Sequence, residues 1–98
     1  MKITKKEKKL FLIYGETGER EDVYQWEVGA VDDLETAKKA CEFLNEKLKA
    51  LGLSYSNCAH WDSKNKLKVI SQYDKKFICS YTGSSYHVKE IPTIDVEF

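Results

Sequence analysis

The heptapeptide "YTGSSYH", residues 81–87, contains the residue types of a loop that binds phosphate: a glycine followed by two serines. Such a loop holds an anion through backbone N–H groups when a helix N-terminus or a suitably placed lysine follows it. Here the loop is followed by "YHVKE", in which apolar and polar residues alternate as in a strand. We therefore interpret residues 82–85 as a hairpin turn, with Tyr81 and Tyr86 facing each other across the strands.

A second group that could do chemistry is the close pair Cys58 and His60, either as metal ligands or as a thiol nucleophile and its base. Cys41, Cys79 and His87 could join them, but the spacing matches no C-x2-C or H-x3-H ligand pair. Cys41 and Cys79 fall on apolar faces, where a free cysteine packs as a small hydrophobic residue. We expect no metal, no cofactor and no catalytic residue.

Charge is segregated along the chain, although 16 basic and 16 acidic residues balance overall. The first nine residues carry five lysines and one glutamate, whereas residues 16–35 carry eight acids and one base. All the basic residues except Arg20 are lysines, which lack the planar fork that reads bases and grips phosphates. This composition argues against a dedicated nucleic-acid binder and predicts a flexible, solvated basic segment over residues 1–7.

An acidic surface is expected if the first two strands pair, because the loop between them and the start of the following helix would then lie at one end of the sheet. Such a surface attracts a basic protein partner, although acids at a helix start also complement its dipole. The seven residues are Glu16, Glu19, Glu21, Asp22, Asp32, Asp33 and Glu35.

Hydrophobic periodicity predicts the first two strands. Residues 8–16 form a short apolar run that ends near a glycine and is apolar on both faces, as in a central strand. Residues 23–31 alternate as in a half-buried strand, with Trp26 and Ala30 on the same face, and we expect this strand to be the hairpin partner of the first.

The clearest element is a helix over residues 33–51, where leucine, alanine and cysteine recur at steps of three and four. Asp32 is the expected N-cap, and Gly52 is the expected residue just beyond the C-terminus.

The second half of the chain gives a weaker pattern. Residues 53–74 are expected to be mostly irregular, with a short strand or helical turn near 65–71. Residues 75–81 and 86–90 alternate as two further strands, and the tail can extend the last strand as far as residue 98. Pro92 lacks a backbone N–H and therefore belongs at a sheet edge or a break.

The expected fold is a single small α+β domain over residues 1–98. It is a two-layer sandwich in the order ββαββ, with an antiparallel sheet of four strands, or five with the tail, and one long helix on one face. Because the first strand is apolar on both sides, one of its faces needs cover from residues 53–74 or from another chain, and a homodimer is one such arrangement. The possible apolar interface consists of Phe11, Ile13 and Trp61.

The sequence also indicates a cytoplasmic protein. No segment approaches the ~20 apolar residues of a membrane helix. The N-terminus does not resemble a signal peptide, and three widely spaced cysteines indicate reduced thiols.

Residues 11–46 and 73–92 together resemble a family of small, functionally unassigned phage and prophage accessory proteins. In that family a strand ending in tyrosine-glycine leads to a "TGE" loop, a tryptophan-bearing strand and a helix rich in alanine and lysine, and a "YTGT-x-Y" hairpin closes the chain. Lys75 and Ser80 stand where proline and aspartate are expected, and Ser84 replaces threonine. The resemblance implies a phage or mobile-element origin and carries no catalytic residues across.

We therefore expect a small non-enzymatic phage or mobile-element protein that binds a host or phage protein, with a basic protein as one candidate, and inhibits or modulates it, as anti-defence proteins do. One alternative is a nucleic-acid or nucleotide binder that uses the N-terminal lysines, the tyrosines and the "TGSS" loop. The second alternative is a small thiol or metal-dependent enzyme that uses Cys58 and His60.

Overall fold

The structure, a computed structural model, describes residues 1–55, 58 and 61–98. These described residues form three strands, two α-helices and one short 3-10 helix. In chain order these are β1 (Lys2–Thr17), η1 (Arg20–Asp22), β2 (Tyr24–Val31), α1 (Leu34–Leu51), α2 (Lys64–Ser71) and β3 (Ser84–Glu97).

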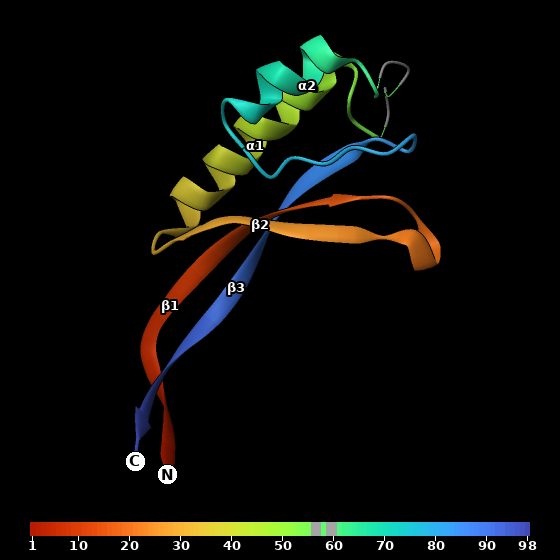
Figure 1. Ribbon diagram of the computed structural model, residues 1–98. Coiled ribbons are helices and arrows are strands. Elements are labelled where there is room, and N and C mark those ends of the chain that lie inside the picture. Colours follow the sequence, from red (N-terminus) through yellow and green to blue (C-terminus); the bar gives the residue numbers. More distant parts are fainter. Residues whose placement is uncertain (56–57, 59–60) are drawn as a thin grey trace.

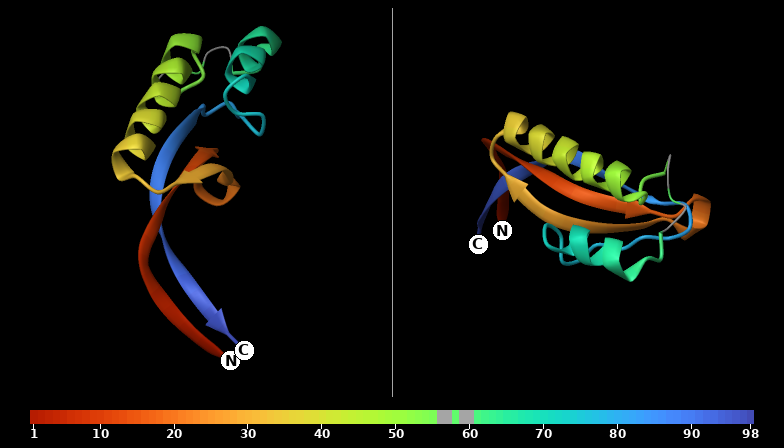
Figure 2. Two further views of the ribbon diagram at one scale, coloured as in Figure 1. Left: turned by 90° about the vertical axis from the view of Figure 1, so that its left-hand side faces the viewer. Right: turned by 90° about the horizontal axis from the view of Figure 1, so that it is seen from above.

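The three strands form one antiparallel sheet in the order β2-β1-β3, so the apolar run around residue 12 is the central strand, as expected. Helix α1 lies over one face of this sheet and contacts all three strands, whereas α2 packs beside α1 (Figures 1 and 2). The α+β class is thus confirmed. The predicted order ββαββ with four or five strands is wrong, because the described elements follow the order ββααβ with three strands.

The missing strand is the segment 75–81, which runs irregularly. Its backbone donors bond to local and side-chain acceptors rather than to a ladder: the Phe77 N–H donates to the Asp74 carbonyl at 3.2 Å and the Ser80 N–H to Thr17 Oγ1 at 3.0 Å. The alternation of Phe77 and Cys79 therefore reflects two side chains that pack on the core from a loop.

Helix α1 confirms the predicted helix, with one change at its start. Asp33, not Asp32, is the N-cap, because its carboxylate accepts the Thr36 N–H at 2.9 Å. Gly52 ends the helix in the left-handed conformation, with φ of 69°. The buried residues of the apolar stripe are Ala37, Cys41, Leu44 and Leu48.

Helix α2 forms where a short strand or helical turn was expected. It buries Ile70, and just beyond its end the Tyr73 ring packs edge-on against Phe43 of α1 with ring centroids 5.2 Å apart. Trp61 precedes this helix and is 36% exposed.

A β-bulge in the β1–β2 pair reverses the expected alternation of β2. Ile13 pairs with Gly29 and Tyr14 with Glu27, so Val28 is the extra residue. Beyond the bulge Val31, rather than Ala30, packs against the core.

The N-terminal segment expected to be flexible is the first half of β1. Lys2–Lys9 pairs with Pro92–Glu97 of β3 to form a two-stranded ribbon, which we call the arm. The arm leaves the body on the side away from the helices (Figure 1). It lengthens the molecule to 51 Å and raises the radius of gyration to 15.8 Å, against about 13 Å for a compact chain of this size. Pro92 lies on β3, an edge strand, as expected.

The core lies between the sheet and the helices, and it contains the face of β1 that was expected to need cover from residues 53–74 or from another chain. Leu53 and Ile70 of that segment are buried in this core. Ile13 is buried and Phe11 packs against the same cluster. The apolar interface predicted at Phe11 and Ile13 is therefore part of the core and is not available to a partner in this fold.

Candidate interaction surfaces

The "TGSS" loop is a turn whose polar groups are used inside the fold. Thr17 Oγ1 donates to the Gly83 carbonyl at 2.7 Å, and Ser84 Oγ donates to the Ile78 carbonyl at 2.7 Å. The hairpin predicted here is wrong, because residues 75–81 form no strand that could pair with β3. Tyr81 is exposed and Tyr86 is buried, so the two rings do not face each other.

The cysteines occupy separate structural positions. The Cys41 thiol donates to the Tyr86 carbonyl at 3.0 Å, and burial raises the pKa of the Cys41 and Cys79 thiols. The Cys58 thiol donates to the Tyr81 carbonyl at 3.0 Å, whereas His60 lies outside the described residues. Among the residues that the structure describes, no three histidine, cysteine, aspartate or glutamate side chains are grouped as metal ligands.

The seven predicted acids form two groups instead of one. Glu16, Glu19, Glu21 and Asp22 lie where β1 turns into β2. Asp32, Asp33 and Glu35 follow the far end of β2, where Val31 pairs with Phe11. The length of β2 separates the groups by roughly 25 Å, because each strand residue adds about 3.3 Å. The helix starts only after β2 has crossed the sheet, and Asp32 lies 3.9 Å from the Lys8 ammonium group there.

Three exposed tyrosines surround the first acidic group. Tyr24, Tyr55 and Tyr81 are 53, 43 and 64% exposed, respectively. The Tyr81 hydroxyl donates to Glu19 at 3.2 Å, and this hydrogen bond raises the pKa of Tyr81. The Tyr55 hydroxyl donates to the Gly18 carbonyl at 3.3 Å. We call these three tyrosines and Glu16, Glu19, Glu21 and Asp22 the acidic tip.

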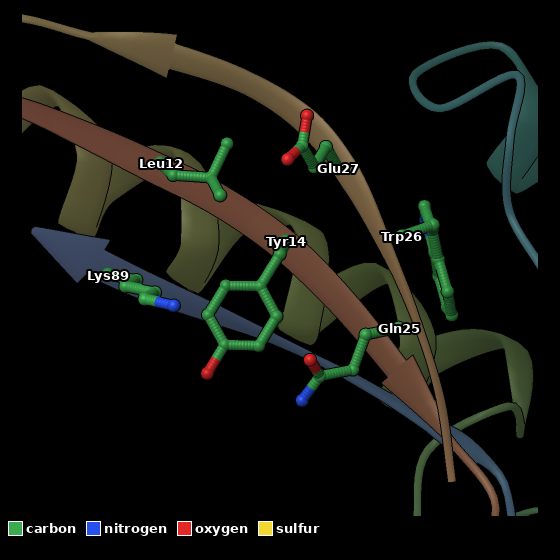
Figure 3. A pocket seen from close by; sticks show the side chains of 6 residues that line it. All are labelled: Leu12, Tyr14, Gln25, Trp26, Glu27 and Lys89. Carbon is green, nitrogen blue, oxygen red and sulfur yellow. The ribbon is translucent and has the colours of Figure 1, made fainter. Parts of the chain in front are cut away.

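The sheet face opposite the helices carries a shallow hollow of about 460 Å³. Leu12 and Tyr14 of β1 form its floor, with Glu27 of β2 on one side and Lys89 of β3 on the other (Figure 3). Trp26 lies at its rim. The face of Phe11 and Ile13 was expected to lack cover from the long helix, but residues of α1 pack on that face, and the face of Leu12 and Tyr14 stays open instead. We call this surface the open face; it consists of Leu10, Leu12, Tyr14, Glu27, Lys89 and Ile91.

A serine, a histidine and a glutamate meet beside the open face without forming a hydrolytic triad. Ser85 Oγ lies 2.7 Å and Glu16 Oε2 3.4 Å from the same nitrogen, Nε2 of His87. A triad requires the acid on one ring nitrogen and the nucleophile on the other. This arrangement therefore orients His87, whose ring also lies 5.4 Å from that of Tyr14.

A buried carboxylate, which sequence patterns did not reveal, joins the sheet to the segment after α2. Asp74 is 4% exposed, and its Oδ2 accepts hydrogen bonds from Trp26 Nε1 and from the Tyr86 hydroxyl, both at 2.7 Å. Its Oδ1 accepts the Lys76 N–H at 3.1 Å. The residue lies in a polar stretch of sequence, where nothing marks it as a core residue.

Burial and the hydrogen bond to Asp74 raise the pKa of Tyr86 far above its ordinary value of 10.0. The folded protein keeps the Tyr86 proton at a pH where the unfolded chain releases it. The contribution of Tyr86 to the free energy of unfolding is therefore complete below about pH 10 and decreases as the pH rises further. We expect the free energy of unfolding of Tyr86→Phe to fall less between pH 9 and pH 11 than that of the wild type. Urea titrations at each pH measure this difference, and equal slopes for the two proteins would contradict it.

No family model, curated protein or solved structure matches this chain. Neither α1 nor α2 combines the length and the apolar composition of a membrane-spanning helix. A function must therefore be inferred from the surfaces described above, and the resemblance to phage accessory proteins stays a prediction.

Proposed function

We propose that this chain is a small non-enzymatic interaction protein whose acidic tip binds a basic surface of another protein. The observation that carries the proposal is the group of three exposed tyrosines among four acids at one end of the sheet. Tyrosine is enriched at protein interfaces because its ring supplies apolar area and its hydroxyl a hydrogen bond. Acids around such rings attract a basic partner and speed its association.

Folding alone does not account for the acidic tip. The four acids at this turn repel each other, and Arg20, which lies among them in η1, offsets only one of the four charges. Helix α1 does not offset them, because it begins at the other end of β2. The Tyr81 ring is held over this charge by its bond to Glu19 and remains 64% exposed. Charge and aromatic area are thus presented together to solvent.

The resemblance to phage and prophage accessory proteins supports a host protein as the partner and its inhibition or modulation as the activity. The three cysteines are free thiols, as is usual for proteins of a reducing compartment. We therefore propose that this binding takes place in the host cytoplasm. The nucleic-acid and thiol-enzyme alternatives rank lower because none of the arrangements described above favours them.

We expect the triple variant Glu16→Lys, Glu19→Lys, Glu21→Lys to slow association with the partner by about tenfold or more, since steering acts on the on-rate. Reversal of the exposed Glu19 or Glu21 should change the free energy of unfolding by no more than about 0.5 kcal/mol, as is usual at surface sites. Reversal of Glu16 should cost more, because its side chain is only 26% exposed and lies 3.4 Å from His87 Nε2. The partner is first captured from host extract on the tagged wild-type chain. Its association rate is then measured by biolayer interferometry at low and at physiological salt.

The matched control is Glu42→Lys, Glu46→Lys, Asp62→Lys, which changes the net charge equally at exposed positions away from the acidic tip. This control should bind almost as fast as the wild type. Equal slowing by both triple variants would show that net charge alone matters. A rate that ignores both the tip reversal and added salt would refute the acidic tip as the binding surface.

A further inference from the structure

The two edges of the sheet differ in how their backbone groups are used. On the β3 edge the Tyr86 N–H donates to Asn45 Oδ1 at 2.8 Å, and Asn45 Nδ2 donates to the Tyr86 carbonyl at 3.0 Å. The Ser84 N–H donates to the Leu53 carbonyl at 2.8 Å. Pro92, farther along the same edge, has no N–H to donate. These features hinder the addition of a strand at both ends of this stretch of β3.

The pairing register shows which residues of β2 face away from the sheet. Two paired residues of an antiparallel ladder turn their backbone groups either both toward each other or both away. Tyr86 turns its groups away from β1, so its partner Gly15 turns toward β2, where it faces Trp26. Because successive residues alternate, the N–H and C=O groups of Gln25 and Glu27 point outward from the edge.

These outward groups have no partner within the part of the chain that the structure describes. None of the hydrogen bonds formed there outside the strand ladders involves the backbone of Gln25 or Glu27. Both residues are exposed, and a Cβ added at Gly29 would meet nothing within 4 Å. The bulge at Val28 limits the regular run of this edge to residues 24–27. A free edge of this kind accepts a short extended segment as a further strand.

Acidic side chains beside this edge favour one kind of occupant. Glu27 lies on β2 itself, and Glu21 and Asp22 lie just before it. No ion pair within the described chain neutralises these three carboxylates, and Arg20 is the one base among residues 16–35. Antiparallel pairing with β2 of a second copy would bring the acids that follow one β2 strand against the acidic tip of the other, and like charges repel. A basic segment is instead attracted by the same charges.

The side chains of β2 also define the pattern of the segment. Gln25 and Glu27 line the hollow of the open face (Figure 3). Tyr24 and Trp26 stack with ring centroids 6.4 Å apart, and Tyr24 is 53% exposed. The side chains of an added strand alternate between the two faces in the same way. Lysine or arginine would therefore lie beside Glu27, and an apolar side chain would lie beside Tyr24.

We propose that the outer edge of β2 binds an extended segment of the partner, in which basic and apolar residues alternate, as an added strand. Tyr24 belongs both to this edge and to the acidic tip, so the two surfaces are continuous. The inference rests on the proposed function, because it specifies the form of the basic surface that the acidic tip attracts.

The test measures amide hydrogen exchange of the isotope-labelled full chain by NMR. The probe is a synthetic peptide of about eight residues in which lysine and valine alternate. Saturating peptide should slow exchange of the Gln25 and Glu27 amides by about tenfold or more, whereas the Trp26 amide, which already faces β1, should change little. A control peptide with the same residues in alternating L and D forms keeps the charge but cannot extend the ladder. It should bind about tenfold more weakly.

A pair of proline variants tests the edge from the side of the protein. Gln25→Pro removes an outward donor without removing a hydrogen bond to β1, and it should weaken binding of the peptide by about fivefold or more. The matched control is Val88→Pro, which removes an outward donor from the β3 edge, also without a change of charge. It should bind like the wild type. Circular dichroism verifies the fold of both variants, and the exchange measurement on the wild type depends on neither.

Exchange of Gln25 and Glu27 that the peptide does not slow overturns the strand addition. Equal binding of the two peptides also overturns it, because charge alone would then explain the attraction. Slower exchange at Val88 and Glu90 instead would place the strand on the other edge, and protection of β2 that rises with protein concentration without peptide would identify a second copy as the occupant. Each of these results leaves the proposed function standing, since that function fails only if the tip reversal does not slow association with the captured partner.

Discussion

Replacing Asp74 with alanine is expected to lower the free energy of unfolding by about 3–5 kcal/mol, because the buried Trp26 N–H and Tyr86 hydroxyl then lose their shared acceptor. The Lys76 N–H loses its bond to the same carboxylate. Since Asp74 joins the segment after α2 to the sheet, this segment should become the first part to open. Urea unfolding followed by far-ultraviolet circular dichroism measures the loss.

The matched control is Asp62→Ala, which removes the same carboxylate from an exposed position before α2. It should change the free energy of unfolding by no more than about 0.5 kcal/mol. If Asp74→Ala does not fold, Asp74→Asn keeps one carbonyl acceptor and should lie between the alanine variant and the wild type. A loss no larger than that of Asp62→Ala would show that the buried carboxylate contributes little.

Replacing Gly15 with alanine is expected to cost about 2–3 kcal/mol, as overpacking a well-filled core does. A Cβ at this position would lie less than 3.0 Å from three carbons of the Trp26 indole ring, which crosses β1 at Gly15. The ring cannot move aside freely, because its Nε1 is bonded to Asp74 and its face and edge pack near Phe77 and Tyr86.

Gly29→Ala is the control for this change, because it adds the same methyl group on β2 where nothing lies within 4 Å. It should leave stability nearly unchanged. Trp26 fluorescence in a Trp61→Phe background should report a moved indole ring in Gly15→Ala and not in Gly29→Ala. Equal stabilities of the two glycine variants would contradict the packing of Trp26 on Gly15.

The sequence alone determined the elements whose signals are local. The apolar stripe of α1 and its glycine end lie within one stretch of chain, so a period of three to four residues was sufficient to predict helix 33–51. The antiparallel pairing of residues 11–17 with 24–31 likewise follows from two neighbouring apolar runs joined by a short polar loop.

Only the tertiary structure decided the features that depend on residues far apart in the chain. Alternation in β1 showed two apolar faces, but only the packing of helix α1 on one of them determined that Leu12 and Tyr14 stay uncovered. The basic residues 2–9 form a strand because residues 92–97, at the other end of the chain, pair with them. Asp74 belongs to the core because Trp26 and Tyr86, from two different strands, donate to it. A pattern read along the chain reports local geometry, whereas these contacts arise from packing between segments that no local period connects.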